Sequence, residues 1–191
     1  GRYRRGIGMS LCFHGDGFTG NGERDLIKAV VRMTKDTDDK AHIFVSSTDM
    51  GQGFFTSLPK IASRELEIPV EDIIYEMPDT HKTPDSGPTV ASRSTMVVGE
   101  LIRRASQKLK EEWVPGEEAE VYEHYTHPDF MIPFDISKFN GDAYPTFSWG
   151  VYCVEVLIDT LTGLVSLPGV WTSFDVGTPI DLNILTGQME G

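Results

Sequence analysis

The sequence predicts an α+β fold, a two-layer α/β sandwich in which helices pack on a mixed, mainly antiparallel sheet. Apolar and polar residues alternate over 146–159, which is typical of a strand. Apolar residues recur at helical spacing over 54–67 and over 89–113, which is typical of amphipathic helices. Because strands and helices follow one another without strict alternation, the sequence does not favour an all-parallel sheet. Its 191 residues suffice for one compact domain or two small ones.

The N-terminal region 7–47 is expected to contain strands and a hairpin joined by glycine-rich and polar connections. Its expected parts are a strand over 7–14, a glycine-rich connection over 15–23, a turn over 35–40 and a strand over 42–47. Residues 26–33 fit two structures. Their alternation with Lys28 and Arg32 fits a strand, whereas the apolar pairs at 26–27 and 30–31 would also line one face of a helix.

The remaining chain mixes helices, strands and irregular stretches. The expected elements are a helix over 54–67, a strand over 73–77, an irregular proline-bearing stretch over 78–88, a helix over 89–113, an irregular aromatic stretch over 121–145, a hairpin over 146–175 and a truncated helix from 179. Pro59 falls in the first turns of its helix, where a missing N–H group costs least. Pro179 is expected at the first position of the last helix.

The charge and composition of the chain exclude several function classes. The net charge is −12, from 17 basic and 29 acidic residues, so phosphate backbones and anionic lipids are repelled. We therefore expect neither a nucleic-acid nor a membrane partner, and no apolar run approaches the ~18 residues of a membrane span. Cys12 and Cys153 lie in apolar runs, which indicates buried thiols in a reducing, cytoplasmic compartment. Since the sequence lacks an initial Met, we expect it to be part of a longer polypeptide.

A glycine-rich motif follows the first expected strand. The segment Gly15-Asp16-Gly17-Phe18-Thr19-Gly20 matches G-x-G-x-x-G. If residues 22–34 formed a helix, this would be a dinucleotide-binding unit of a nicotinamide-dependent oxidoreductase. The acidic residue that such a unit needs is not convincing, since the candidates lie in the turn at 36–39. The motif alone is weak, and a glycine-rich connection in a β-hairpin is the favoured interpretation.

Two other segments have the composition of ligand-binding loops. Thr48-Asp49-Met50-Gly51-Gln52-Gly53 joins a strand to a helix, and its glycines let a ligand approach the backbone. The amide of Gln52 suits the edge of a heterocycle, although a plain strand-to-helix turn fits equally well. The second segment, 85–94, opens the long helix, where free N–H groups and the helix dipole favour an anion.

The second segment also carries unusual side chains for a simple helix start. Thr89, Ser92 and Ser94 add hydroxyl groups and Arg93 adds a cation. Capping by Ser86 or Thr89 would explain one hydroxyl but not all of them. This composition suits a phosphate-bearing cofactor.

Metal and hydrolase sites have little support in the sequence. His124 and His127, with Asp129 nearby, could form half of a metal site, but no third ligand stands out. The G-x-S-x-G motif of serine hydrolases is absent.

Four motifs in order resemble those of one enzyme family. They are Asp49-Met50-Gly51-Gln52-Gly53, Pro88-Thr89-Val90-Ala91-Ser92-Arg93-Ser94, the stretch from Ser148-Trp149-Gly150-Val151 to Asp159-Thr160-Leu161-Thr162-Gly163, and Gly187-Gln188-Met189-Glu190-Gly191. Together they resemble the molybdenum-binding subunit of xanthine dehydrogenases and aldehyde oxidases. The resemblance spans almost the whole chain and outweighs the dinucleotide-binding interpretation, because the family places a β-hairpin at 15–20.

The resemblance implies a function for particular residues. The family binds a molybdopterin cofactor, in some members as the cytosine dinucleotide, and hydroxylates an sp² carbon of an aldehyde or N-heterocycle with oxygen from water. Electrons then pass to 2Fe–2S centres and FAD on partner domains or subunits, in an oligomeric enzyme. By motif matching, the cofactor-binding residues would be Met50, Gly51, Gln52, Ala91, Ser92, Ser94 and Gln188.

Departures from the family pattern limit what the chain is expected to do alone. The family's catalytic glutamate falls beyond Gly191, so no catalytic residue is expected in this chain, and we expect it to be inactive by itself. Arg93 stands where many members have a small or apolar residue, so its role is open. The segments 14–20 and 85–89 look more like purine (xanthine) dehydrogenases than aldehyde oxidases. Phe13, His14 and Phe18 are candidates for the wall of a pocket for a planar heterocycle.

Overall fold

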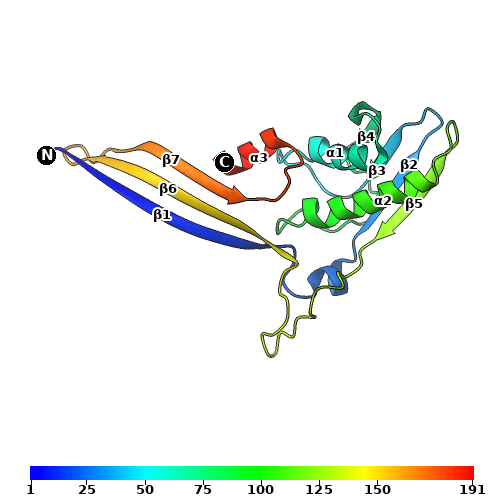
Figure 1. Ribbon diagram of the computed structural model, residues 1–191, viewed down its shortest axis with the longest axis horizontal. Helices are drawn as coiled ribbons and strands as arrows, with labels where there is room; N and C mark the ends of the chain where they lie inside the picture. The colour runs from blue at the N-terminus through cyan, green and yellow to red at the C-terminus, as the bar shows by residue number, and fades with distance from the viewer. The chain divides into compact units, whose positions relative to one another are not determined.

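The computed structural model describes all residues, 1–191, and divides into two compact units (Figure 1). The ribbon unit comprises Gly1–Gly15 and Thr146–Pro179, and the core unit comprises Asp16–Pro145 and Ile180–Gly191. Helices and strands occur in separate layers and no barrel forms, so the expected α+β class with mixed sheets is confirmed.

The ribbon unit is a sheet of three long strands in the order β1-β6-β7. These are β1 (Tyr3–Asp16), β6 (Thr146–Asp159) and β7 (Val165–Asp175). β6 and β7 pair antiparallel, with a register shift between Glu155 and Leu157, as the alternating pattern over 146–175 predicts. Arg2 joins the end of β1 to Asp159 on β6 through a bidentate contact, with distances of 2.9 and 2.5 Å.

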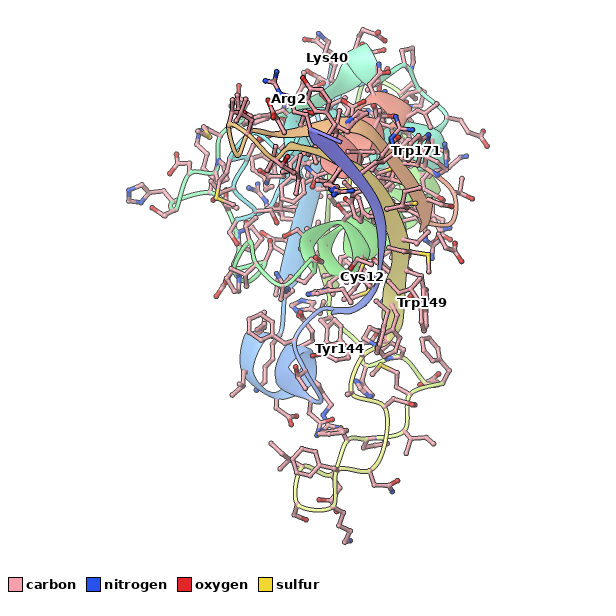
Figure 2. All side chains as sticks on the ribbon, turned by 90° about the vertical axis from the view of Figure 1, so that its left-hand side faces the viewer. Arg2, Cys12, Lys40, Tyr144, Trp149 and Trp171 are labelled. Carbon is pink, nitrogen blue, oxygen red and sulfur yellow. The ribbon has the colours of Figure 1, made fainter.

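The ribbon unit has almost no buried side chains, and only Asp159 is buried. Residues two apart on a strand share a face, so β1 presents one apolar row that is 64–75% exposed: Ile7, Met9, Leu11 and Phe13. Cys12, Trp149 and Trp171 also project from this sheet (Figure 2). Cys12 is exposed and Cys153 is half-buried, so the expectation that both thiols are buried is wrong. The unit therefore has no hydrophobic core of its own.

The core unit is built on a four-stranded sheet in the order β4-β3-β2-β5. The strands are β2 (Val30–Lys35), β3 (Ala41–Phe44), β4 (Ile73–Tyr75) and β5 (Ala119–His124). β2 pairs antiparallel with both β3 and β5, whereas β3 and β4 are parallel. This is the mixed, mainly antiparallel sheet that the sequence predicts.

Two helices cover one face of this sheet, α1 (Phe54–Leu66) and α2 (Gly99–Glu111). Alternate residues of β2 point toward them, and Val31 and Met33 are fully buried while Arg32 lies on the open face. The buried residues of the two helices recur at helical spacing: Phe54, Leu58, Ala62 and Leu66 on α1, and Leu101, Ile102, Ala105 and Leu109 on α2. Helix α3 (Leu182–Glu190) completes the unit, and none of the helices has the length and apolar character needed to cross a bilayer.

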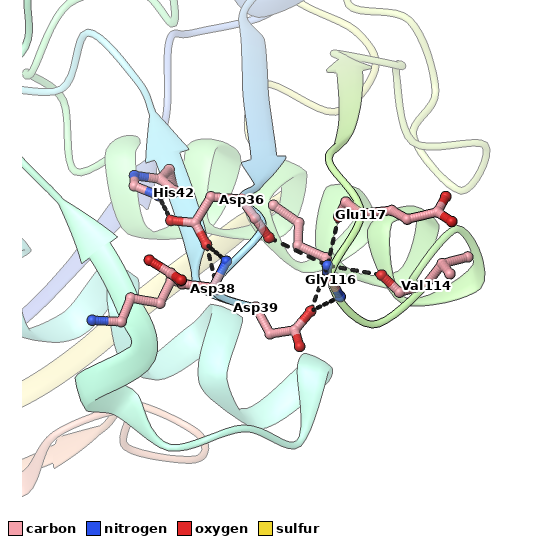
Figure 3. A network of polar contacts seen from close by, with 9 residues as sticks. Asp36, Asp38, Asp39, His42, Val114, Gly116 and Glu117 are labelled. Carbon is pink, nitrogen blue, oxygen red and sulfur yellow. Dashed lines mark hydrogen bonds and ion pairs between the residues drawn. The ribbon is translucent and has the colours of Figure 1, made fainter.

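The turn between β2 and β3 is held by the side chain of its first residue, Asp36, and by that of Lys35, the last residue of β2 (Figure 3). The carboxylate of Asp36 accepts hydrogen bonds from the N–H groups of Asp38 and Lys40, at 3.0 and 2.9 Å. The ammonium of Lys35 is fully buried and donates to the carbonyls of Val114 and Glu117, at 2.9 and 2.6 Å. Lys35 therefore joins this turn to the loop that follows α2.

The long helix expected over 89–113 starts later than its sequence pattern predicts. Ala91 and Ser92 have φ angles of +54° and +53°, in the left-handed region that a right-handed helix cannot contain. A single π-helical turn then covers Ser94–Val98 and α2 begins at Gly99. The last helix also starts later than expected, because its N-cap is Asp181 rather than Thr178.

Two expected features of the strands are corrected by the structure. The stretch 121–145 was expected to be irregular, yet β5 occupies residues 119–124. The ambiguity over 26–33 is resolved in favour of a strand, which begins at Val30 after a short π-helical segment at Glu23–Ile27.

These findings exclude the dinucleotide-binding interpretation of 15–20. That fold needs parallel strands joined by a helix, whereas β2 and β3 are antiparallel neighbours joined by a tight turn. The motif is not the connection of a β-hairpin either, since β1 and β2 belong to different sheets.

Candidate functional site

Two loops of the core unit lie side by side. One joins β3 to α1, and the other precedes α2. The N–H of Thr48 donates to Oγ1 of Thr89 at 2.8 Å. Ser46 and Ser86 exchange two bonds, each backbone N–H donating to the other's hydroxyl, at 3.1 and 2.8 Å. The loops at 46–53 and 86–94, which the sequence singles out separately, are therefore neighbours.

The first loop is held in shape by the carboxylate of Asp49. It accepts hydrogen bonds from the N–H groups of Gly51 and Phe55, at 2.8 and 3.0 Å. It thereby satisfies a free N–H group in the first turn of α1. Burial acts to raise the pKa of Asp49, but these backbone donors outweigh it and the pKa lies below its ordinary value. The helix end is therefore already supplied with an anion from the chain itself.

The tip of this loop exposes Met50 and Gly51, while Gln52 folds back on the loop. Met50 is 72% exposed. Oε1 of Gln52 accepts from the N–H of Met50 at 2.6 Å, and Nε2 donates to the carbonyl of Thr48 at 2.7 Å. Gln52 thus maintains the shape of the loop, and its amide would have to exchange these bonds to contact a ligand directly.

The second loop contains a strained turn at Ala91 and Ser92. Two successive non-glycine residues with positive φ each cost about 1–2 kcal/mol, so surrounding contacts must hold the turn. Both residues are exposed. The next hydroxyl group, Oγ of Ser94, belongs to a residue that is only 4% exposed, and it has no hydrogen-bond partner. A buried hydroxyl without a partner is costly, which marks Ser94, two residues after the turn, as a place where a ligand can supply one.

Arg93 does not have the role that the sequence suggested. Its guanidinium is fully buried and bonds the carboxylate of Glu23 through two contacts, of 2.6 and 2.9 Å. It also donates to the carbonyls of Ser86 and Pro88, at 2.9 and 3.0 Å. The expectation that Arg93 adds a cation to an anion site is wrong, since its charge is matched by Glu23 inside the protein. The sequence analysis missed Glu23, because no local pattern links residues 70 positions apart.

Gln188 lies on α3, which contacts the first loop. Asp181 accepts from the N–H of Ile184 at 2.9 Å and pairs with Lys60 of α1. Gly53 packs against Ile184 so closely that a Cβ atom at position 53 would come within 2.7 Å of its side chain. Figure 1 shows α3 beside the start of α1. The exposed Gln188 is therefore carried by a helix anchored at the first loop.

The three candidate pocket residues are not all in one unit. Phe13 and His14 belong to the ribbon unit, where the ring of Phe13 stacks on Trp149 with centroids 5.0 Å apart. Phe18 belongs to the core unit and packs against Gly22. The substrate pocket remains a prediction.

No metal centre is visible among the side chains. No group of three or more His, Cys, Asp or Glu residues is placed to hold a metal ion. The half-site suggested by His124 and His127 gains no third ligand, and both ring nitrogens of His127 are buried without a hydrogen-bond partner.

The family is decided by a match over the whole chain. The model of the molybdopterin cofactor-binding domain matches residues 1–123 and again residues 114–191. The chain belongs to this family. The resemblance read from the four sequence motifs is confirmed, and two of those motifs form the neighbouring loops described above.

Curated relatives and solved structures agree with this family. Xanthine dehydrogenase/oxidase of Felis catus is 30% identical over 175 residues, 81% of this chain and 13% of the relative. Nicotinate hydroxylase hnxS of Emericella nidulans is 26% identical over 214 aligned positions, 98% of this chain and 16% of the relative. The aldehyde oxidoreductase structure from Desulfovibrio desulfuricans superposes with a TM-score of 0.82 at 24% identity, over 98% of this chain and 22% of that one, which shows a shared fold. The chain thus spans about one-sixth or less of the curated relatives' length.

Proposed function

We propose that this chain holds the molybdopterin cofactor of a molybdenum hydroxylase, through Met50, Gly51, Gln52, Ala91, Ser92, Ser94 and Gln188. The single observation that carries this proposal is the hydrogen bond between Thr48 and Thr89, at 2.8 Å. It joins the two loops that bear six of these seven residues. The contact of α3 with Gly53 brings the helix of Gln188 to the same loops.

The residues present fit a cofactor that carries a pterin and a phosphate. The buried Oγ of Ser94 lacks a partner and can donate to a phosphate oxygen. The turn at 91–92 stands before the π-helical turn Ser94–Val98 that leads into α2, and the free N–H groups at such a helical start favour an anion. Because Glu23 neutralises Arg93, the turn offers neutral N–H and hydroxyl donors rather than a positive charge.

When bound, the cofactor supplies the redox centre at which a substrate carbon is hydroxylated with oxygen from water. The residues of this chain hold and orient it. Three carboxylates next to the site by sequence or contact, those of Asp49, Glu23 and Asp85, all accept hydrogen bonds within the chain. We therefore expect the general base to come from another part of the enzyme, and the isolated chain to be inactive.

The proposed substrate of the intact enzyme is a purine-like N-heterocycle such as xanthine or hypoxanthine, which would place it in purine metabolism. Two relatives support an N-heterocycle, since one is a xanthine dehydrogenase/oxidase and the other a nicotinate hydroxylase. A nicotinate-like heterocycle or an aldehyde is the alternative. Comparing turnover of hypoxanthine, nicotinate and benzaldehyde by the enzyme that carries this chain separates the three.

We also propose partners and a location for the enzyme that carries this chain. We expect 2Fe–2S and FAD groups on partner domains or subunits, an oligomeric enzyme and a cytoplasmic location. The free state of Cys12 and Cys153 is consistent with a reducing compartment. The cytosine dinucleotide form of the cofactor remains one option for its nucleotide.

Pterin content tests the proposal. The enzyme carrying this chain is purified with Ser94→Ala or Gln188→Ala, and the pterin released by oxidation is measured by fluorescence per mole of protein. Controls are Ser106→Ala, a buried serine of α2 whose hydroxyl faces Met33, and Gln107→Ala, an exposed glutamine of α2. We expect the site variants to lose most of their pterin and the controls to keep it. Unchanged pterin content in both site variants would contradict the proposal.

A further inference from the structure

The strained turn at Ala91 and Ser92 requires an external constraint. Neither residue has the conformational freedom of glycine, yet both adopt positive φ. Such backbone persists only where neighbouring contacts fix it. Neighbouring side chains must therefore hold this turn.

Arg93 closes the loop that contains the turn. Its side chain runs back toward the preceding residues and donates to the carbonyls of Ser86 and Pro88, while its backbone N–H donates to the carbonyl of Val90 at 3.2 Å. Both ends of the segment 86–93 are thus held by one residue. The planar guanidinium supplies several donors in a fixed arrangement, which lysine cannot reproduce.

Glu23 fixes Arg93 in turn. Its two carboxylate oxygens accept from Nε and Nη2, and both side chains are at least nine-tenths buried. Ile27, in the same π-helical segment as Glu23, packs against the loop. A Cβ atom at Gly87 would lie 2.4 Å from Ile27 and 2.9 Å from the guanidinium. This packing keeps the side chain of Arg93 from turning toward solvent.

The glycine-rich segment supplies a second fastening. The N–H of Gly17 donates to the carbonyl of Ala91 at 2.8 Å, at the first residue of the strained turn. A side chain at position 17 would meet Met96, and its φ of +95° is suited to glycine. The motif that superficially resembles a dinucleotide loop thus lies against the turn.

We propose that Glu23, Arg93 and Gly17 form a positioning clamp that holds Ala91 and Ser92 in the left-handed conformation needed to present the turn to the cofactor. The proposal rests on the proposed function. It adds that the segment 16–23, which contacts no cofactor in our account, determines the geometry of the cofactor turn. It also assigns the recognition of the anionic group to neutral donors, because the guanidinium is used inside the clamp.

The clamp is tested first on the 191-residue chain itself. The double variant Glu23→Leu/Arg93→Met replaces the pair by apolar side chains, which a protein interior often tolerates. The control is Glu100→Leu/Arg103→Met, an exposed pair on α2. NMR measures the one-bond Cα–Hα coupling, which reports the sign of φ at Ala91 and Ser92, and the exchange rate of the Gly17 amide.

We expect the double variant to lose positive φ at both residues and to exchange the Gly17 amide about tenfold faster or more, while the control changes neither. Arg93→Lys keeps the charge but lacks the planar set of guanidinium donors. We expect this variant to lose positive φ and the protection of the Gly17 amide to a lesser degree. If the double variant does not fold, Arg93→Lys decides. A folded variant that keeps both signals would overturn the clamp.

The same variants in the enzyme that carries this chain separate the clamp from the function. The readout is the time course of pterin loss during dialysis, followed by fluorescence. We expect faster loss in Glu23→Leu/Arg93→Met and in Arg93→Lys than in the control. If φ changes sign but pterin is retained as before, the clamp stands and the assignment of this turn to the cofactor is overturned.

Discussion

The guanidinium of Arg93 and the carboxylate of Glu23 form two parallel hydrogen bonds, of 2.6 and 2.9 Å, across 70 positions of the chain. The pair is inside the core unit, and each partner leaves the other uncompensated if it is removed. Because the same arginine also bonds two carbonyls of the loop before the turn, its loss affects the fold and the candidate site together.

Breaking this pair should destabilise the protein strongly. Removing one partner of a buried ion pair costs about 3–5 kcal/mol, so we expect Arg93→Ala and Glu23→Gln to lower the free energy of unfolding by an amount in that range. Urea denaturation followed by circular dichroism measures it. The exposed pair of Glu100 and Arg103 gives the comparison, since Arg103→Ala should cost about 1 kcal/mol or less. A loss for Arg93→Ala as small as that for Arg103→Ala would show that Arg93 is not structural.

A side chain at position 87 should also destabilise the core unit. Gly87 has a φ of +81°, and a Cβ atom there would overlap Ile27 and the guanidinium of Arg93. We expect Gly87→Ala to cost about 2–4 kcal/mol, from backbone strain together with overpacking. Gly116→Ala is the matched control, because Gly116 has a φ of +77° with open space around it and should show the strain alone. Thermal melting of the two variants separates the contributions.

Lys35 should stabilise the loop after α2, because its buried ammonium bonds groups of that loop. Its buried ammonium donates to the carbonyls of Val114 and Glu117 and pairs with the carboxylate of Asp39, and Lys35→Met would remove all three contacts. We expect a loss of about 2–4 kcal/mol in the free energy of unfolding. The exposed Lys40→Met should change it by less than about 0.5 kcal/mol. A loss confined to Lys40→Met would contradict the assignment.

The link between Arg2 and Asp159 should persist to low pH. The side-chain hydrogen bonds from Arg2 are the main cause that lowers the pKa of Asp159 to about 2. A carboxyl with a depressed folded pKa contributes stability above its unfolded pKa of about 4 and loses it as the pH falls toward 2. Carbon NMR of the Asp159 carboxyl should give a midpoint near 2 in the native chain. In Arg2→Gln the midpoint should rise toward the ordinary value, and an unchanged midpoint would exclude Arg2 as the cause.

The elements that were predicted correctly are those with a strong periodic pattern. Helix α1 follows from the spacing of Leu58, Ala62 and Leu66, which are all buried. The hairpin of β6 and β7 follows from alternation and from Gly163 in its turn, which has a φ of +75°. Local sequence is sufficient where the pattern and the packing agree.

The elements that were missed depend on contacts far apart in the chain. Strand β5 was hidden because one of its inward residues is Glu123, which is buried only through pairing with Arg104 and Lys108 of α2. The start of α2 was misplaced because the left-handed turn at 91–92 is held by Gly17 and Arg93, which no helical pattern reveals. The two loops that carry the predicted site residues were singled out by motif, whereas the use of Arg93 inside the protein was not predicted.

The central claim is that the loops at 46–53 and 86–94 hold one molybdopterin cofactor. The most direct measurement is a crystal structure of the cofactor-loaded enzyme that carries this chain. Our account predicts Oγ of Ser94 within about 3 Å of a phosphate or pterin atom, with Met50 and Gly51 against the same cofactor. A cofactor seated elsewhere, with both loops facing solvent or other protein, would contradict it.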